Sequence, residues 1–192
     1  MKRIIAVLSL VLVLALSLTA CSGKKDHKAS AKVYTDKENI LSITLTDSFD
    51  SSKREFTNGV TYTSNSGTGV TIEKISAVIT AENDMANLEA MYAEDAKETN
   101  NVIKGKLTIH THGETKDKIV TATNGARYYV FTLDADGGKY VYLKAFMKNG
   151  NYAYSITFST TEDAYTKEEY NKHFITWLNS ATITLPSTPA DQ

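Results

Sequence analysis

The sequence predicts a fold of the α+β class, in which an antiparallel β-sheet is flanked by helices on both faces. Segments of alternating apolar and polar residues recur along the chain between turn-forming residues, which indicates antiparallel strands. Two other segments repeat apolar residues at helical spacing. The long strands of the second half are apolar on both faces, and a sheet that buries both faces needs a covering layer on each side.

Alternation of side chains predicts the strands of the first half. Residues 41–45 alternate between aliphatic and hydroxyl side chains, as expected of a strand with one buried face. Residues 60–63 alternate in the same way, and a serine- and glycine-rich turn at 64–69 leads from them into a β-rich segment at 70–80. These two segments are predicted to form a hairpin. A further strand is expected at 107–111.

Three long strands, over 126–133, 139–147 and 152–159, are predicted to form an antiparallel meander. An Asn-Gly pair at 124–125 precedes the first strand, and a second pair at 149–150 joins the last two. Asn-Gly between β-rich segments indicates a tight hairpin, because both turn residues adopt positive φ angles there.

The first predicted helix follows Asn83 and Asp84, either of which can cap its N-terminus. Met85, Leu88 and Tyr92 then recur at helical spacing. We expect this helix to end near the Asn-Asn pair at 100–101.

The second predicted helix begins at a capping box. Thr166 and Glu169 have the T-x-x-E spacing in which each side chain binds a free backbone amide of the first turn. An apolar stripe follows and is expected to pack against the sheet. Its members are Tyr170, Phe174, Trp177 and Leu178.

The N-terminus has the features of a bacterial lipoprotein signal peptide. Lys2 and Arg3 precede an apolar run of 15 residues over 4–18, which is shorter than the roughly 20 residues of a membrane-spanning helix. Residues 18–20, Leu-Thr-Ala, and Cys21 resemble a lipobox, in which the cysteine thiol receives a diacylglycerol and acyl chains such as palmitate. The alternative is an ordinary signal peptide that leaves Cys21 as a free thiol.

The chain is therefore divided into four parts. We expect a lipoprotein signal peptide over 1–20, a lipidated flexible tether over 21–31, a globular domain over 32–185 and a C-terminal tail over 186–192. The mature protein would lie outside the cytoplasm, anchored to the cell membrane by its lipid.

Composition excludes several classes of function. The 21 basic and 22 acidic residues give a net charge of −1, without the basic excess of a nucleic-acid-binding protein. One cysteine allows neither an intramolecular disulfide nor a cysteine-rich zinc site. No nucleophile motif or phosphate-binding loop was recognised, so neither an enzymatic activity nor a cofactor is expected.

Four stretches, at 41–50, 88–92, 123–160 and 166–183, occur in an order that is similar to the PsbP-like domain. This is the fold of an extrinsic photosystem II subunit, of a yeast Ran-binding import factor and of many small bacterial lipoproteins. The resemblance implies an α/β/α sandwich. It also implies binding of other macromolecules, in assembly or transport, and supplies no set of catalytic residues. The opening strand departs from the family, with Thr46 and Phe49 where Pro and Trp often stand.

Two groups of side chains are candidate sites. His110 and His112 are two residues apart on a predicted strand, so both rings point to one side and can share a metal ion. The alternative is a pair of exposed histidines without metal. The tyrosines of the meander can form an exposed row that binds a partner or ligand, or can simply be strand-forming core residues. The four candidates are Tyr140, Tyr142, Tyr152 and Tyr154.

The function expected from these observations is non-enzymatic. The leading hypothesis is a membrane-anchored binding or accessory module for another protein of the cell envelope. A lipoprotein that binds a small ligand or a metal is the alternative, and an enzyme of unknown type is the third possibility.

Overall fold

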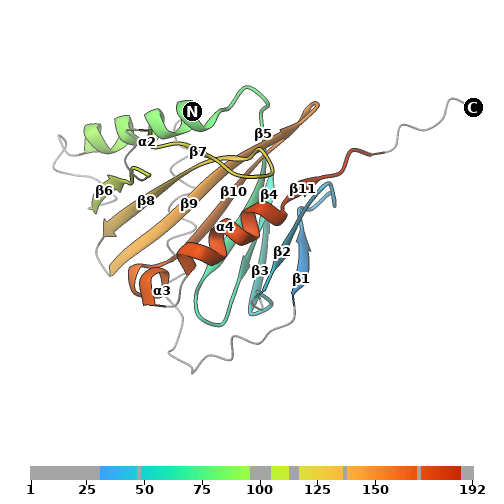
Figure 1. Cartoon of the computed structure of the whole chain (residues 1–192), viewed down its shortest axis with the longest axis horizontal. Helices are drawn as coiled ribbons and strands as arrows, with labels where there is room; N and C mark the ends of the chain where they lie inside the picture. Colours follow the sequence, from blue (N-terminus) through green and yellow to red (C-terminus); the bar gives the residue numbers. More distant parts are fainter. Residues whose placement is uncertain are drawn as a thin grey trace, which may run out of the picture.

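Strands dominate the structure, which contains two antiparallel β-sheets (Figure 1). The computed structural model describes residues 31–46, 49–95, 105–112, 117–135, 138–167 and 170–186. The larger sheet has eight strands in the order β3-β4-β5-β10-β9-β8-β6, with β7 also paired to β8, and the smaller has the order β1-β2-β11. The strands are β1 (Lys32–Thr35), β2 (Leu41–Leu45), β3 (Ser52–Phe56), β4 (Gly59–Thr63), β5 (Gly69–Ile75), β6 (Gly105–Ile109), β7 (Val120–Thr121), β8 (Arg127–Ala135), β9 (Gly138–Asn149), β10 (Tyr152–Thr161) and β11 (Thr182–Ile183).

The predicted fold class, an antiparallel sheet flanked by helices on both faces in an α/β/α sandwich, is wrong. The described residues contain only three helices, α2 (Ala81–Asp95), α3 (Glu162–Lys167) and α4 (Tyr170–Ser180). One face of the large sheet is covered by the second sheet together with α4, so that layer is largely β-structure. The molecule is mainly a two-sheet β protein with few helices.

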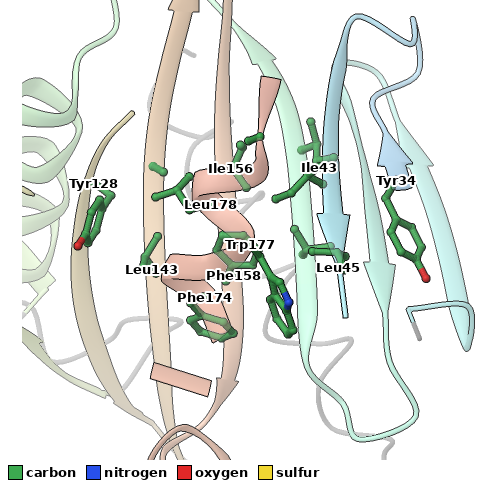
Figure 2. Packing of buried hydrophobic residues seen from close by; sticks show 14 of the residues in the cluster. Tyr34, Ile43, Leu45, Tyr128, Leu143, Ile156, Phe158, Phe174, Trp177 and Leu178 are labelled. Carbon is green, nitrogen blue, oxygen red and sulfur yellow. The ribbon is translucent and has the colours of Figure 1, made fainter. Parts of the chain in front are cut away.

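The first face of the large sheet carries the main hydrophobic core (Figure 2). Leu143 on β9 and Phe158 on β10 lie opposite each other in the strand register and are fully buried. Trp177 of α4 packs on Phe158 with 5.9 Å between ring centroids. Ile43 and Leu45 of β2 complete this layer, which joins the small sheet, α4 and the large sheet.

The second face of the large sheet is covered by α2 over its β6–β8 end (Figure 1). The helix begins at Ala81, after Thr80, whose hydroxyl accepts a hydrogen bond from the amide of Asn83. Thr80 therefore caps it, instead of the predicted Asn83 or Asp84. The predicted apolar stripe of the helix packs on a second core of aromatic residues from β8 and β9.

The predicted strands at 41–45 and 60–63 and the three-stranded meander are confirmed as β2, β4 and β8-β9-β10. Gly125 and Gly150 have positive φ angles of 84° and 58°, but Asn124 and Asn149 do not, so the predicted turns with positive φ at both Asn and Gly are not formed.

The predicted capping box of the second helix is wrong at Thr166. This residue lies inside α3, and its hydroxyl donates a hydrogen bond to the carbonyl of Glu162. Glu169 lies outside the described residues. The predicted stripe of the second helix is confirmed, because its four members are buried in α4.

The predicted signal peptide, Cys21 and the tether up to residue 30 lie outside the described residues, as does the tail beyond Pro186. Within the described part of the chain, no helix is both long enough and apolar enough to cross a membrane.

Candidate functional site

The two histidines predicted as metal ligands follow the end of β6. The ring nitrogen Nε2 of His110 hydrogen-bonds the hydroxyl of Thr132 at 2.5 Å, and the His112 ring packs edge-on against Tyr128, with 5.6 Å between centroids. Burial, followed by the charge of His110, lowers the pKa of His112. Among the described residues, no group of three or more His, Cys, Asp or Glu side chains is placed to hold a metal ion. His110 thus hydrogen-bonds β8 through Thr132, and the His112 ring packs on β8 at Tyr128.

The tyrosines predicted to form an exposed row do not form one. Tyr140, Tyr142 and Tyr154 are 5%, 1% and 0% exposed, and only Tyr152 is half-buried. The register also separates them, because Tyr140 and Tyr142 lie on the second face of the large sheet and Tyr154 on the first. Of the two alternatives, the structure shows strand-forming core residues at Tyr140, Tyr142 and Tyr154, because covering layers bury both faces of the meander.

Exposed apolar side chains do not define a site in their place. The large ones among the described residues are Val33, Val78, Ile79 and Leu185, and only Val78 and Ile79 are neighbours in sequence. Monomeric proteins commonly expose single apolar residues, so these positions need no functional explanation.

A strip of hydroxyl side chains crosses the second face of the large sheet beyond α2. We call it the hydroxyl strip. Its side chains come from β4, β5 and β10, and the strand registers place all of them on one face. Four members are 8% exposed or less, although they are polar, and the fifth, Thr157, is half-buried. The members are Thr61, Thr71, Ser155, Thr157 and Ser159.

The fold uses only some of these hydroxyl groups. Thr61 and Thr71 hydrogen-bond each other at 2.9 Å. No hydrogen bond of the Ser155, Thr157 or Ser159 hydroxyl is found among the described residues, and none of these oxygens is one of the fully buried side-chain atoms without a partner.

Glu73 lies beside the hydroxyl strip on β5, directly opposite Ser155 in the register. Its carboxylate has no hydrogen bond or ion pair among the described residues. Burial raises the pKa of Glu73 above its ordinary value of 4.5, although the positive charge of Lys144 partly offsets the effect. A carboxyl group whose pKa is raised by burial is more stable in its protonated, neutral form or next to a positive charge.

A hydrogen bond and an ion pair connect α2 to the large sheet next to the hydroxyl strip. Asp84 of the helix accepts a hydrogen bond of 2.6 Å from the hydroxyl of Tyr129 and pairs with Lys144 at 2.9 Å. Burial, together with the Asp84 carboxylate, raises the pKa of Tyr129, so this phenol remains a hydrogen-bond donor at physiological pH. Lys144 lies opposite Thr157 in the register, which places the charged pair next to the strip.

This face groups polar side chains. Ser155, Thr157 and Ser159 place hydroxyls in a row, and the half-buried carboxyl of Glu73 lies beside them, although Ser155 and Ser159 are only 3% and 6% exposed. Sequence reasoning missed this site, although the hydroxyl residues at every second position of 155–159 were visible. The alternation by itself is typical of a solvent-facing strand surface, and only the structure shows the low exposure of these residues.

Comparisons with known proteins show no family. No protein-family model and no curated protein matches the sequence. A solved structure from Bacteroides thetaiotaomicron is similar over 84% of this chain, with 10% sequence identity and a TM-score of 0.45. The chain spans 50% of the length of that protein.

Proposed function

We propose that the protein is a lipid-anchored module outside the cytoplasm that binds a segment of another envelope protein and acts by binding, without catalysis. The hydroxyl strip is the observation that supports this proposal most. Among the described residues no hydrogen bond to the hydroxyls of Ser155, Thr157 or Ser159 is found, so these groups could hydrogen-bond a partner.

The proposed anchor is compatible with such a role. Lipidation at Cys21 would leave ten residues, 22–31, between the membrane and the first strand at Lys32. An extended chain of that length reaches about 35 Å. The domain would therefore be held close to the envelope while remaining free to turn toward a partner.

Site-specific cross-linking in intact cells tests the proposal. Thr157→Cys places a small thiol in the hydroxyl strip, and Thr176→Cys places one on the exposed side of α4 as a matched control. Cys21 is the only native cysteine, and acylation would block it. After labelling with a photoreactive maleimide, we expect Thr157→Cys alone to give a discrete adduct with one envelope protein. Equal labelling patterns from both variants, or no adduct from either, would contradict the proposal.

A further inference from the structure

Three Asn-Gly pairs occur in the chain, at 58–59, 124–125 and 149–150, and all three lie where one strand turns into the next. We propose that Asn58 and Asn149 are sites of spontaneous deamidation, whereas the fold keeps Asn124 from reacting. The inference is independent of the proposed function, because it concerns a covalent modification of the chain itself.

Deamidation is an intramolecular reaction between an asparagine side chain and the next residue. The backbone nitrogen of that residue attacks the side-chain carbonyl carbon, a C–N bond forms, and the side-chain nitrogen leaves as ammonia together with the backbone amide proton. Water then opens the resulting succinimide to aspartate or isoaspartate, so one water is consumed and neither an oxidant nor a reductant is needed. A following glycine has no side chain to hinder the attack. The reaction therefore requires that the carboxamide and the next backbone nitrogen can approach each other.

Both reacting groups of the pair at 124–125 are held by the fold. The Asn124 Nδ2 atom donates hydrogen bonds to the carbonyls of Leu178 and Ala181, at 2.8 and 3.0 Å, at the end of α4. The backbone nitrogen of Gly125, which would be the nucleophile, donates to the carbonyl of Ala122 at 3.0 Å. Attack at Asn124 therefore requires the end of α4 to separate from this turn.

The pair at 149–150 is exposed at the turn between β9 and β10. The hydrogen bond found for the Asn149 side chain among the described residues runs from Nδ2 to the carbonyl of Ile183, with a length of 3.2 Å and in an exposed position. No backbone hydrogen bond of the Gly150 nitrogen is found among the described residues. The nucleophile is therefore available, and only one exposed contact holds the carboxamide.

Asn58 is exposed in the turn between β3 and β4, where Phe56 pairs with Gly59. Its backbone carbonyl accepts a hydrogen bond of 2.8 Å from the amide of Lys74. No hydrogen bond of its carboxamide is found among the described residues. The side chain can therefore turn toward the Gly59 nitrogen, which the side chain of Asn124 cannot do toward Gly125.

Incubation of the intact protein in detergent at mildly alkaline pH, followed by peptide mass spectrometry, tests the inference. Trypsin separates the three pairs, because basic residues place them in the segments 55–74, 119–127 and 149–172. In the folded protein we expect Asn58 and Asn149 each to deamidate at least about tenfold faster than Asn124, because only Asn124 needs a local opening of the fold. In guanidinium chloride all three should react at similar rates, since each is followed by glycine.

Two outcomes would overturn the inference. One is a smaller difference between Asn124 and either of the other two sites in the folded protein. The other is a slow reaction at Asn124 that persists in guanidinium chloride, because the protection would then not come from the fold.

Loss of the Asn149 carboxamide gives a second readout. An aspartate at this position cannot donate a hydrogen bond to Ile183, and its carboxylate is repelled by that carbonyl oxygen. Asn149→Asp should therefore accelerate hydrogen exchange in the peptide that contains β11 about threefold. Asn58→Asp adds the same charge at a side chain for which no hydrogen bond to β11 is found among the described residues, and should leave this exchange unchanged. Equal exchange in the two variants would refute this consequence of deamidation.

Discussion

Removal of Asp84 should loosen the attachment of α2 to the large sheet. Its carboxylate accepts the 2.6 Å hydrogen bond from Tyr129 and pairs with Lys144, and the side chains of this pair are only 24% and 26% exposed. A hydrogen bond to a charged group contributes about 1.5–3 kcal/mol, and the Tyr129 hydroxyl would lose its partner in a buried position. We therefore expect Asp84→Ala to lower the free energy of unfolding by about 3 kcal/mol.

Glu82→Ala is the matched control for Asp84→Ala. Glu82 lies in the same first turn of α2, so both substitutions remove a carboxylate near the helix N-terminus and lose the same favourable dipole interaction. Glu82 pairs with Arg127, but these side chains are 45% and 51% exposed, and such pairs contribute about 0.2–1 kcal/mol. Urea denaturation measures both losses. Agreement of the two variants to within about 0.5 kcal/mol would refute the assigned role of Asp84.

Two further predictions concern the turn after β1 and the anchor. Asp36 accepts hydrogen bonds of 2.7 and 2.8 Å from the amides of Ile40 and Leu41, and one of 3.1 Å from the Tyr154 hydroxyl. Asp36→Ala should cost about 3–5 kcal/mol in thermal denaturation and Tyr154→Phe only about 1 kcal/mol, and equal losses would contradict this assignment. Cys21→Ser should move the protein from the membrane fraction to the soluble fraction, and its retention in membranes would refute the lipid anchor.

The sequence predicted the strands whose signals are local. Alternation and the Asn-Gly pairs located the meander, because both signals arise within a few neighbouring residues. The small sheet was not predicted, because its pairings join distant segments. β11 has two residues, and Thr182 pairs with Ser42 across most of the chain. No local pattern indicates such a pairing, and for that reason the covering layer was predicted as helical.

Burial at the candidate sites could not be predicted for a similar reason. The apolar pattern of Tyr140 and Tyr142 fits an exposed aromatic row as well as a core, and only the packing of α2 decides between the two. The spacing of His110 and His112 correctly placed both rings toward the same face of β8. It could not show that Thr132 and Tyr128 would be their neighbours.

The two faces of β10 have different roles. One face packs in the hydrophobic core, and the other carries the hydroxyl strip at which we propose that a partner binds. Ile156 and Phe158 face the first core and are fully buried, as a stable strand requires. Ser155, Thr157 and Ser159 face the other way, where short hydroxyl side chains give little apolar burial. Apolar residues at these positions would serve folding at least as well. The side of β10 that contributes least apolar burial to folding is therefore the side on which we propose that a partner binds.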